Sequence, residues 1–291
     1  MATTQIAKRF LCWTVAVVVG LGMVGCQDRY AAEQLLWQAN RKAAPLQRDI
    51  KQAAEADVLA AVEAYRHVVD RCPGTVEAAK AQMSMGGIYY GREQYEPSRE
   101  AFSEVSRKYG QFREMAASAQ FMVGQALERQ GKWGDAVRAY EEIFLNQTWT
   151  MQAMRTRLYV AEAWGRRGNQ AESSKAYDRA LKAYHEAVKA APTPELASQT
   201  YGFIATVHER QQQWDKALET YRIIAQQYPN TSKAPVALFA MGALYKSRLN
   251  QMDKAFEAFR ELTKQYPEHF LTRIVQPELK LRDEGGVRQQ Q

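Results

Sequence analysis

The sequence predicts an all-α protein built as an array of repeated helical hairpins, and three observations predict this fold class. Residues that favour helices, such as alanine, glutamate and lysine, are frequent, whereas the 17 glycines and nine prolines stand mainly between blocks. Alternating stretches rich in valine or isoleucine, the pattern of β-strands, are absent beyond the first 25 residues. An Ala-x-x-x-aromatic pattern recurs, mostly every 37 or 38 residues.

Residues 1–25 have the three-part layout of a secretory signal peptide. A polar start ending in Lys8 and Arg9 precedes an apolar segment, and small or apolar residues lead up to Cys26. The apolar segment, residues 10–25, is shorter than the about 20 residues needed to span a bilayer. We therefore expect this segment to direct the chain out of the cytoplasm and to be removed.

The charge and the cysteines exclude two classes of protein. The chain carries a formal charge of +7, and removing Lys8 and Arg9 leaves 37 basic against 32 acidic residues. These charges are interleaved along the chain, so no nucleic-acid binding is expected. Cys12 lies in the signal segment, so at most two of the three cysteines survive processing and a disulfide framework is excluded.

The stretch from Leu21 to Cys26 resembles the lipobox of bacterial lipoproteins, in which small residues precede a cysteine that is acylated. This resemblance implies that Cys26 becomes a lipid-bearing N-terminus. Gln27, rather than aspartate, follows the cysteine, which implies the periplasmic face of the outer membrane. The alternative is an ordinary signal peptide, or an uncleaved anchor, with Cys26 incidental.

The repeat combines a helix that has a small residue at its eighth position, a short turn, and a second helix with Ala-x-x-x-aromatic. The second-helix small residues are Ala61, Ser98, Ala136, Ser173, Ala217 and Ala255. The first-helix small residues are Gly86, Gly124, Ala161, Ala205 and Gly242. Small residues let the two helices approach closely, and the aromatic residue, one turn further on the same face, fills the gap beside them.

These residues resemble the tetratricopeptide repeat (TPR). The resemblance implies a right-handed superhelix of about six hairpins, an α-solenoid, in which each hairpin buries its apolar face on its neighbours. The repeats are predicted over residues 46–191, as blocks one to four, and 192–275, as blocks five and six.

The spacing is irregular at one place, where consecutive copies are 44 residues apart. The extra residues coincide with Lys182–Ala191, which continue the helical pattern, and with Pro192-Thr193-Pro194. We predict an extended helix followed by a bend at these prolines. Residues 26–45 are predicted to form a lead-in containing a helix that breaks near Pro45, and residues 276–291 a tail that frays from Arg282.

No catalytic or metal-binding pattern is present. The four histidines lack metal-ligand spacing, and His208 occupies a packing position of its repeat. Cys72 stands before Pro73 where tyrosine precedes proline in later blocks, so we interpret it as a packing residue. No enzymatic activity, cofactor or metal is expected.

In TPR arrays the first helix of each hairpin lines a concave channel. The resemblance implies that seven residues of this sequence stand at the positions that contact ligands in the family. They are Lys80, Tyr90, Arg129, Arg155, Arg166, Arg210 and Lys246. This would form a basic ladder suited to an acidic segment or a C-terminal carboxylate of another protein. The alternative is that these residues belong to ordinary solvated helix faces.

The longer repeat and its Tyr-Pro closures resemble envelope TPR lipoproteins, such as the outer-membrane β-barrel assembly lipoprotein and the Tol-Pal-associated division coordinator. The resemblance implies a periplasmic, lipid-anchored scaffold that assists outer-membrane assembly by binding other envelope proteins. The alternative function is a glycan- or peptidoglycan-associated binding protein of polysaccharide export or cell division.

Overall fold

The computed structural model describes residues 30–146 and 149–288, and every regular element in these ranges is a helix. The first helix covers residues 30–43 and is followed by the short 3-10 helix η1, Ala44–Gln47. The remaining helices are α2 Glu55–Arg71, α3 Val76–Gly91, α4 Tyr95–Lys108, α5 Arg113–Arg129, α6 Trp133–Asn146, α7 Met151–Arg166, α8 Gln170–Ala190, α9 Pro194–Arg210, α10 Trp214–Gln227, α11 Ala234–Ser247, α12 Met252–Gln265 and α13 Phe270–Arg288.

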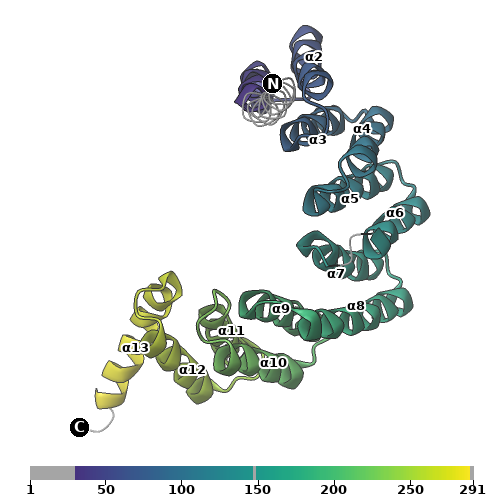
Figure 1. Cartoon of the computed structure of the whole chain (residues 1–291). Helices are drawn as coiled ribbons and strands as arrows, with labels where there is room; N and C mark the ends of the chain where they lie inside the picture. The colour runs from purple at the N-terminus through teal and green to yellow at the C-terminus, as the bar shows by residue number, and fades with distance from the viewer. Residues whose placement is uncertain (1–29, 147–148, 289–291) are drawn as a thin grey trace, which may run out of the picture. The chain divides into compact units, whose positions relative to one another are not determined.

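The helices pair into hairpins, whose first and second members we call A and B helices. The A helices are α3, α5, α7, α9 and α11, and the corresponding B helices are α4, α6, α8, α10 and α12 (Figure 1). The helix over residues 30–43 packs on α2 through Ala39 and forms a further hairpin at the start. The predicted all-α fold of about six hairpins is confirmed.

The chain divides into two compact units, unit 1 up to Ala153 and unit 2 from Met154. The division lies inside α7. The bend that the sequence predicts at Pro192–Pro194 stays a prediction. Pro194 is the first residue of α9, and the Thr193 side chain caps the start of this helix. The extended helix before these prolines is confirmed, since α8 has 21 residues.

Close packing between A and B helices follows the predicted pattern. A Cβ atom added at Gly124 would lie 2.2 Å from the Tyr140 ring, and one at Gly242 would lie 2.2 Å from the Phe259 ring. In the two repeats that carry serine, the hydroxyl adds a bond between the helices. Ser98 donates to the carbonyl of Gly86 at 3.0 Å, and Ser173 donates to that of Ala161 at 2.8 Å.

The turn from each A helix to its B helix contains one residue in the left-handed region. Gly131 and Gly168 adopt it without strain, whereas Glu93 does so at φ 61° although its side chain disfavours it. The same conformation recurs at Gln212 and Asn250. A shared backbone conformation at corresponding places gives the five hairpins the same reversal of direction.

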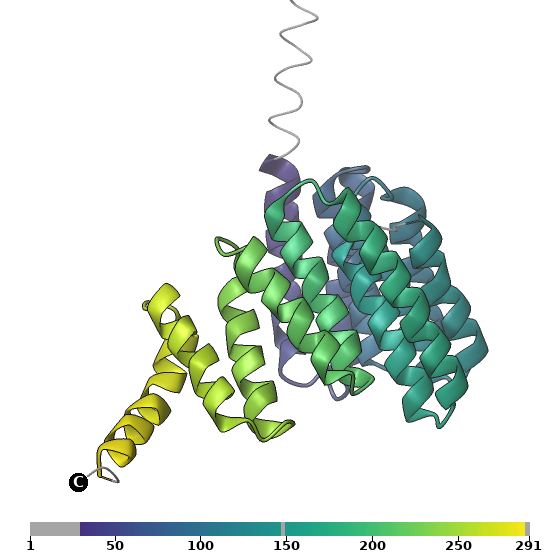
Figure 2. The same cartoon turned by 90° about the horizontal axis from the view of Figure 1, so that it is seen from below.

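The last helix differs from the predicted frayed tail, because α13 continues through Arg288. Leu271, Val275 and Leu279 are buried in the core formed with α10, α11 and α12. Arg282 and Asp283 also form ion pairs with Asp253 and Arg260 of α12, each at 2.5 Å. α13 therefore packs on the last hairpin of unit 2 (Figure 2).

Arg92 ties the loop after η1 to the turn between α3 and α4. Its Nη1 atom donates to the carbonyls of Ile50, Lys51 and Ala53 at 3.4, 3.0 and 3.0 Å. Its Nη2 atom lies 2.7 Å from the Glu55 carboxylate, and its side chain is largely buried. One guanidinium group thus satisfies carbonyls that belong to no helix.

Replacing Arg92 with alanine is expected to lower the free energy of unfolding by about 2 kcal/mol, because three carbonyls lose a charged donor. Urea unfolding followed by circular dichroism measures the change, and hydrogen exchange should quicken within residues 30–54. Arg66→Ala, an exposed arginine of α2, is the control and should change stability by less than about 0.5 kcal/mol. Equal effects of the two substitutions would contradict this role of Arg92.

Candidate functional site

The seven residues predicted to contact a partner all lie on A helices. Lys80 and Tyr90 belong to α3, Arg129 to α5, Arg155 and Arg166 to α7, Arg210 to α9 and Lys246 to α11. The six cations are exposed and Tyr90 is half-buried. Because unit 1 ends within α7, the arrangement is described separately for each unit.

In unit 1, Tyr90 and Arg129 lie together. The Arg129 Nε atom donates to the Tyr90 hydroxyl at 3.3 Å, which joins neighbouring A helices. The ring of Tyr95 packs edge-on against Tyr90, with centroids 5.9 Å apart. The result is an arginine held beside two aromatic rings on the surface.

In unit 2, Glu162 of α7 is shared by two of the predicted arginines. Arg210 of α9 donates to its carboxylate at 2.6 Å, and Arg166 lies 3.7 Å from the other oxygen. The hydrogen bond to Glu162 raises the pKa of Arg210. The Arg166 guanidinium also lies over the Tyr159 ring, 5.3 Å from its centroid. This group of two cations and one carboxylate carries only a single net positive charge.

Lys246 is paired as well, since its ammonium group lies 2.5 Å from the carboxylate of Glu278 in α13. Arg129, Arg210 and Lys246 each contact the A helix or α13 next to their own, so these side chains connect helices within the protein. Lys80 and Arg155 differ, because no ion pair or hydrogen bond joins their side chains to another described residue. The basic residues are therefore not equivalent, and these two retain an unneutralised charge.

The sequence-based prediction missed an apolar stripe on α13. Phe270 and Ile274 are each 57% exposed and Leu281 is 71% exposed. Their spacing, together with Pro277, follows i, i+4, i+7 and i+11, so they share one side of the helix, opposite the buried core face. This spacing is visible in the sequence, but the charged residues after Lys280 favoured a solvated tail.

The stripe corresponds in position to the exposed face of the A helices. Tyr266-Pro267 repeats Tyr228-Pro229 after 38 residues, and the same shift places Ile274 at the position of Val236. Val236 of α11 is itself an exposed apolar residue, and α11 and α13 are in contact. Apolar side chains thus continue across two neighbouring helices of unit 2.

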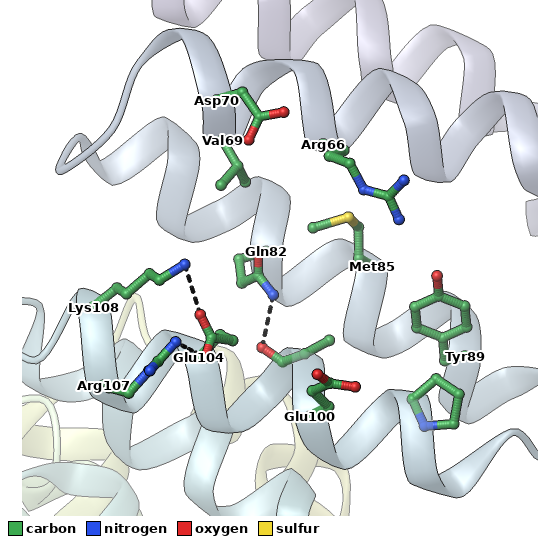
Figure 3. A pocket seen from close by; sticks show the side chains of 12 residues that line it. Arg66, Val69, Asp70, Gln82, Met85, Tyr89, Glu100, Glu104, Arg107 and Lys108 are labelled. Carbon is green, nitrogen blue, oxygen red and sulfur yellow. Dashed lines mark hydrogen bonds and ion pairs between the residues drawn. The ribbon is translucent and has the colours of Figure 1, made fainter.

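A groove lies between the B helices α2 and α4 of unit 1, with α3 beneath it, and has a volume of ≈ 470 Å³ (Figure 3). Its charged side chains are largely engaged along one wall, where Glu104 pairs with Arg107 and with Lys108 at 2.7 Å. Gln82 donates to the carbonyl of Ala101 at 3.1 Å. The residues that line the groove include neither histidine nor cysteine.

His208 and Cys72, the residues considered as candidates for chemistry, occupy packing and helix-end positions. His208 is buried in α9, its Nδ1 atom lies 3.1 Å from the Gln213 amide oxygen, and burial lowers its pKa. Cys72 caps the end of α2, and its backbone conformation closely matches that of Tyr228 and Tyr266 at the ends of α10 and α12. Within residues 30–146 and 149–288, no three histidine, cysteine or acidic side chains gather as metal ligands would.

The predicted signal segment, residues 1–25, and Cys26 lie outside the described residues. None of the helices in the part of the chain that the structure describes is both long enough and apolar enough to cross a membrane.

Family models of the tetratricopeptide repeat match residues 83–147, 204–231 and 236–269. The first match covers most of two hairpins of unit 1, and the other two fall on hairpins of unit 2. The chain therefore contains tetratricopeptide repeats, as its residue pattern predicts. No curated protein sequence matches this chain.

Solved structures with a similar arrangement include BtubC (BKLC) from P. vanneervenii, at 12% identity, covering 76% of this chain and 90% of that one, with a TM-score of 0.47. A second is TTC0263, a thermophilic TPR protein in Thermus thermophilus, at 14% identity, covering 70% and 100%, with a TM-score of 0.42. A third is MamA from Desulfovibrio magneticus RS-1, at 16% identity, covering 66% and 96%, with a TM-score of 0.39.

Proposed function

We propose that this chain of tetratricopeptide repeats is a non-enzymatic, lipid-anchored scaffold on the periplasmic face of a bacterial outer membrane. It holds a segment of another envelope protein on the exposed face of its A helices. Repeats of this kind are typically non-catalytic and bind proteins or peptides. The layout of residues 1–25, followed by Cys26 and Gln27, supports the location.

The observation that carries the proposal is the apolar surface on α11 and α13. Val236, Ile274 and Leu281 are exposed there, although elsewhere unit 2 buries most of its large apolar side chains. Such a patch on an otherwise polar surface marks an interaction site, because a partner that covers it removes apolar area from water. The stripe along α13 fits apolar side chains that recur every three or four residues, as on an amphipathic helix.

Charge adds a second element of recognition. Lys80 in unit 1 and Arg155 in unit 2 have no described partner, and Arg129 is held beside Tyr90 and Tyr95. Carboxylates of a partner can pair with these cations without first displacing an internal acid. The Glu162 group is less suited to this role, because its arginines are already paired. Within unit 2, the apolar surface and Arg155 favour a partner segment that is both apolar and acidic.

Replacing Ile274 and Leu281 together with aspartate is expected to reduce recovery of the partner at least tenfold. The partner is captured by crosslinking the chain in intact envelopes and identified by mass spectrometry. The substitutions place charge on an apolar surface while leaving the buried face of α13 unchanged. Leu59→Asp is the matched control, since Leu59 of α2 is 54% exposed and lies outside this surface.

Unchanged protein recovery from the double variant would remove α13 as the docking surface. If polysaccharide or peptidoglycan, and no protein, is retained by the parent chain, the scaffold function itself is wrong. That outcome would favour the glycan-binding alternative.

A further inference from the structure

The helix over residues 30–43 has an apolar side on each of two opposite faces. Ala32 and Ala39 are buried, and Leu35, Leu36 and Ala43 pack against the core of the first hairpin. On the opposite side, Tyr30 is 72% exposed and Trp37 is 57% exposed. Residues seven apart share a helix face, so the two aromatic rings point the same way, out of unit 1. The helix is drawn in purple beside α2 and α3 in Figure 1.

A basic side chain accompanies these rings. The Arg41 guanidinium lies over the Trp37 ring, 5.0 Å from its centroid, and Lys42 follows it at an exposed position. Glu33 lies at one edge of the helix face that carries Tyr30 and Trp37, and the uncharged Gln34 and Gln38 lie at the other edge. Arg48, also exposed, lies just beyond η1, and Lys51 is paired with Glu93. Each aromatic side chain of this surface thus combines an apolar ring with a polar group, the hydroxyl of Tyr30 or the indole N–H of Trp37. A basic side chain lies beside the Trp37 ring.

These residue types favour the boundary between a bilayer and water. Tyrosine and tryptophan place their rings among lipid headgroups while their polar atoms remain solvated, and arginine and lysine attract anionic lipids. A protein partner would favour a pocket or a continuous ridge, whereas Tyr30 and Trp37 are separated by two helical turns with Gln34 between them. A lipid bilayer is fluid and laterally extended, so it can contact both rings without shape complementarity.

The short separation in sequence between Cys26 and this helix also favours a membrane contact at this surface. Tyr30 follows Cys26 by four residues, and four extended residues reach at most about 14 Å. If Cys26 carries the lipid, the helix cannot lie further than this from the headgroups. A short tether keeps the local concentration of the membrane high, so a contact that binds vesicles only weakly from solution can still orient the anchored protein.

We propose that Tyr30, Trp37 and Arg41 form a membrane-facing surface that lies against the phospholipid headgroups. This proposal rests on the proposed lipid anchor at Cys26, but it concerns a separate contact. It sets which side of the first hairpin faces the bilayer, and so how the A helices of unit 1 are presented to the periplasm.

The first test places the processed, acylated chain in bilayers of phosphatidylethanolamine and phosphatidylglycerol whose acyl chains carry bromine, a quencher of tryptophan fluorescence. The difference in fluorescence between the parent chain and the Trp37→Phe variant gives the emission of Trp37 alone. We expect this component to fall at least twofold in brominated bilayers. Trp149→Phe is the matched control, because Trp149 is also exposed but lies outside this surface, and its component should not change. Equal behaviour of the two components overturns the proposal.

A second test separates the surface from the anchor. Incorporation of labelled palmitate into the parent, and its loss in Cys26→Ser, reports acylation. Binding of the Cys26→Ser chain to phosphatidylglycerol vesicles should fall at least threefold when Tyr30 and Trp37 are replaced with serine, and Leu59→Ser should leave it unchanged. Without palmitate incorporation, but with this threefold fall, the anchor is wrong and the surface stands. With palmitate incorporated and Trp37 not quenched, the surface is wrong and the anchor stands.

Discussion

Gly124→Ala is expected to destabilise unit 1 by about 3 kcal/mol, because the new methyl group has no space. The added Cβ atom would lie 2.2 Å from the Tyr140 ring, where no real carbon contact occurs. The ring cannot move aside easily, since it is completely buried and its hydroxyl is bonded to Gln125 at 2.8 Å and to Glu128 at 2.9 Å. The helix propensity of alanine offsets only about 1 kcal/mol of this cost.

Gly87→Ala is the matched control in the same unit. A Cβ atom at Gly87 meets nothing within 4 Å, so this substitution should stabilise α3 by up to about 1 kcal/mol. Urea unfolding of both variants, followed by circular dichroism, measures the contrast. Combining Gly124→Ala with Tyr140→Leu should recover part of the loss, as a double-mutant cycle would show. Equal stability of the two glycine variants would contradict the close approach of α5 and α6.

Phe259→Ala is expected to lower the free energy of unfolding of unit 2 by about 3–5 kcal/mol, because it leaves a cavity in the core. The ring is 3% exposed, covers Gly242 and packs against Phe239 with centroids 6.0 Å apart. Each hairpin depends on its neighbours for burial, so the cavity should also loosen α13. Thermal unfolding measures the loss, and limited proteolysis after Arg282 reports the loosening.

Phe270→Ala removes the same side chain from an exposed position of α13. Because this ring is already in contact with water, its removal should change stability by less than about 1 kcal/mol. A similar loss from both phenylalanines would show that the position of the ring in the repeat does not determine its contribution.

The repeat pattern predicts most of the fold because it is a local code for packing. Trp133, Trp214 and Met252 open α6, α10 and α12, each three residues before the alanine of the pattern at position 136, 217 or 255. The small residues and aromatics of the pattern are buried together because each hairpin can hide its apolar face only against the next. The serines at positions 98 and 173 fit the same scheme, since a hydroxyl is small enough and finds a carbonyl acceptor.

The candidate site could be predicted only in part. The sequence places the seven residues on A helices, but it does not show that Glu162 is shared by Arg166 and Arg210, or that Lys246 pairs with Glu278. A charged side chain pairs with an opposite charge that is close in space, which need not be close in the sequence. Arg210, for example, pairs with Glu162, 48 residues away along the chain. The exposed stripe of α13 was missed for a related reason, because a solvated tail and a docked helix share the same charged composition.

The sequence by itself determined the helices, their pairing in hairpins and the positions where only small residues fit, because these depend on contacts between residues close in the chain. The tertiary structure decided which charges neutralise one another, which aromatic rings stay in water and where α13 packs. These features depend on the separation of side chains on different helices, which local sequence patterns do not encode.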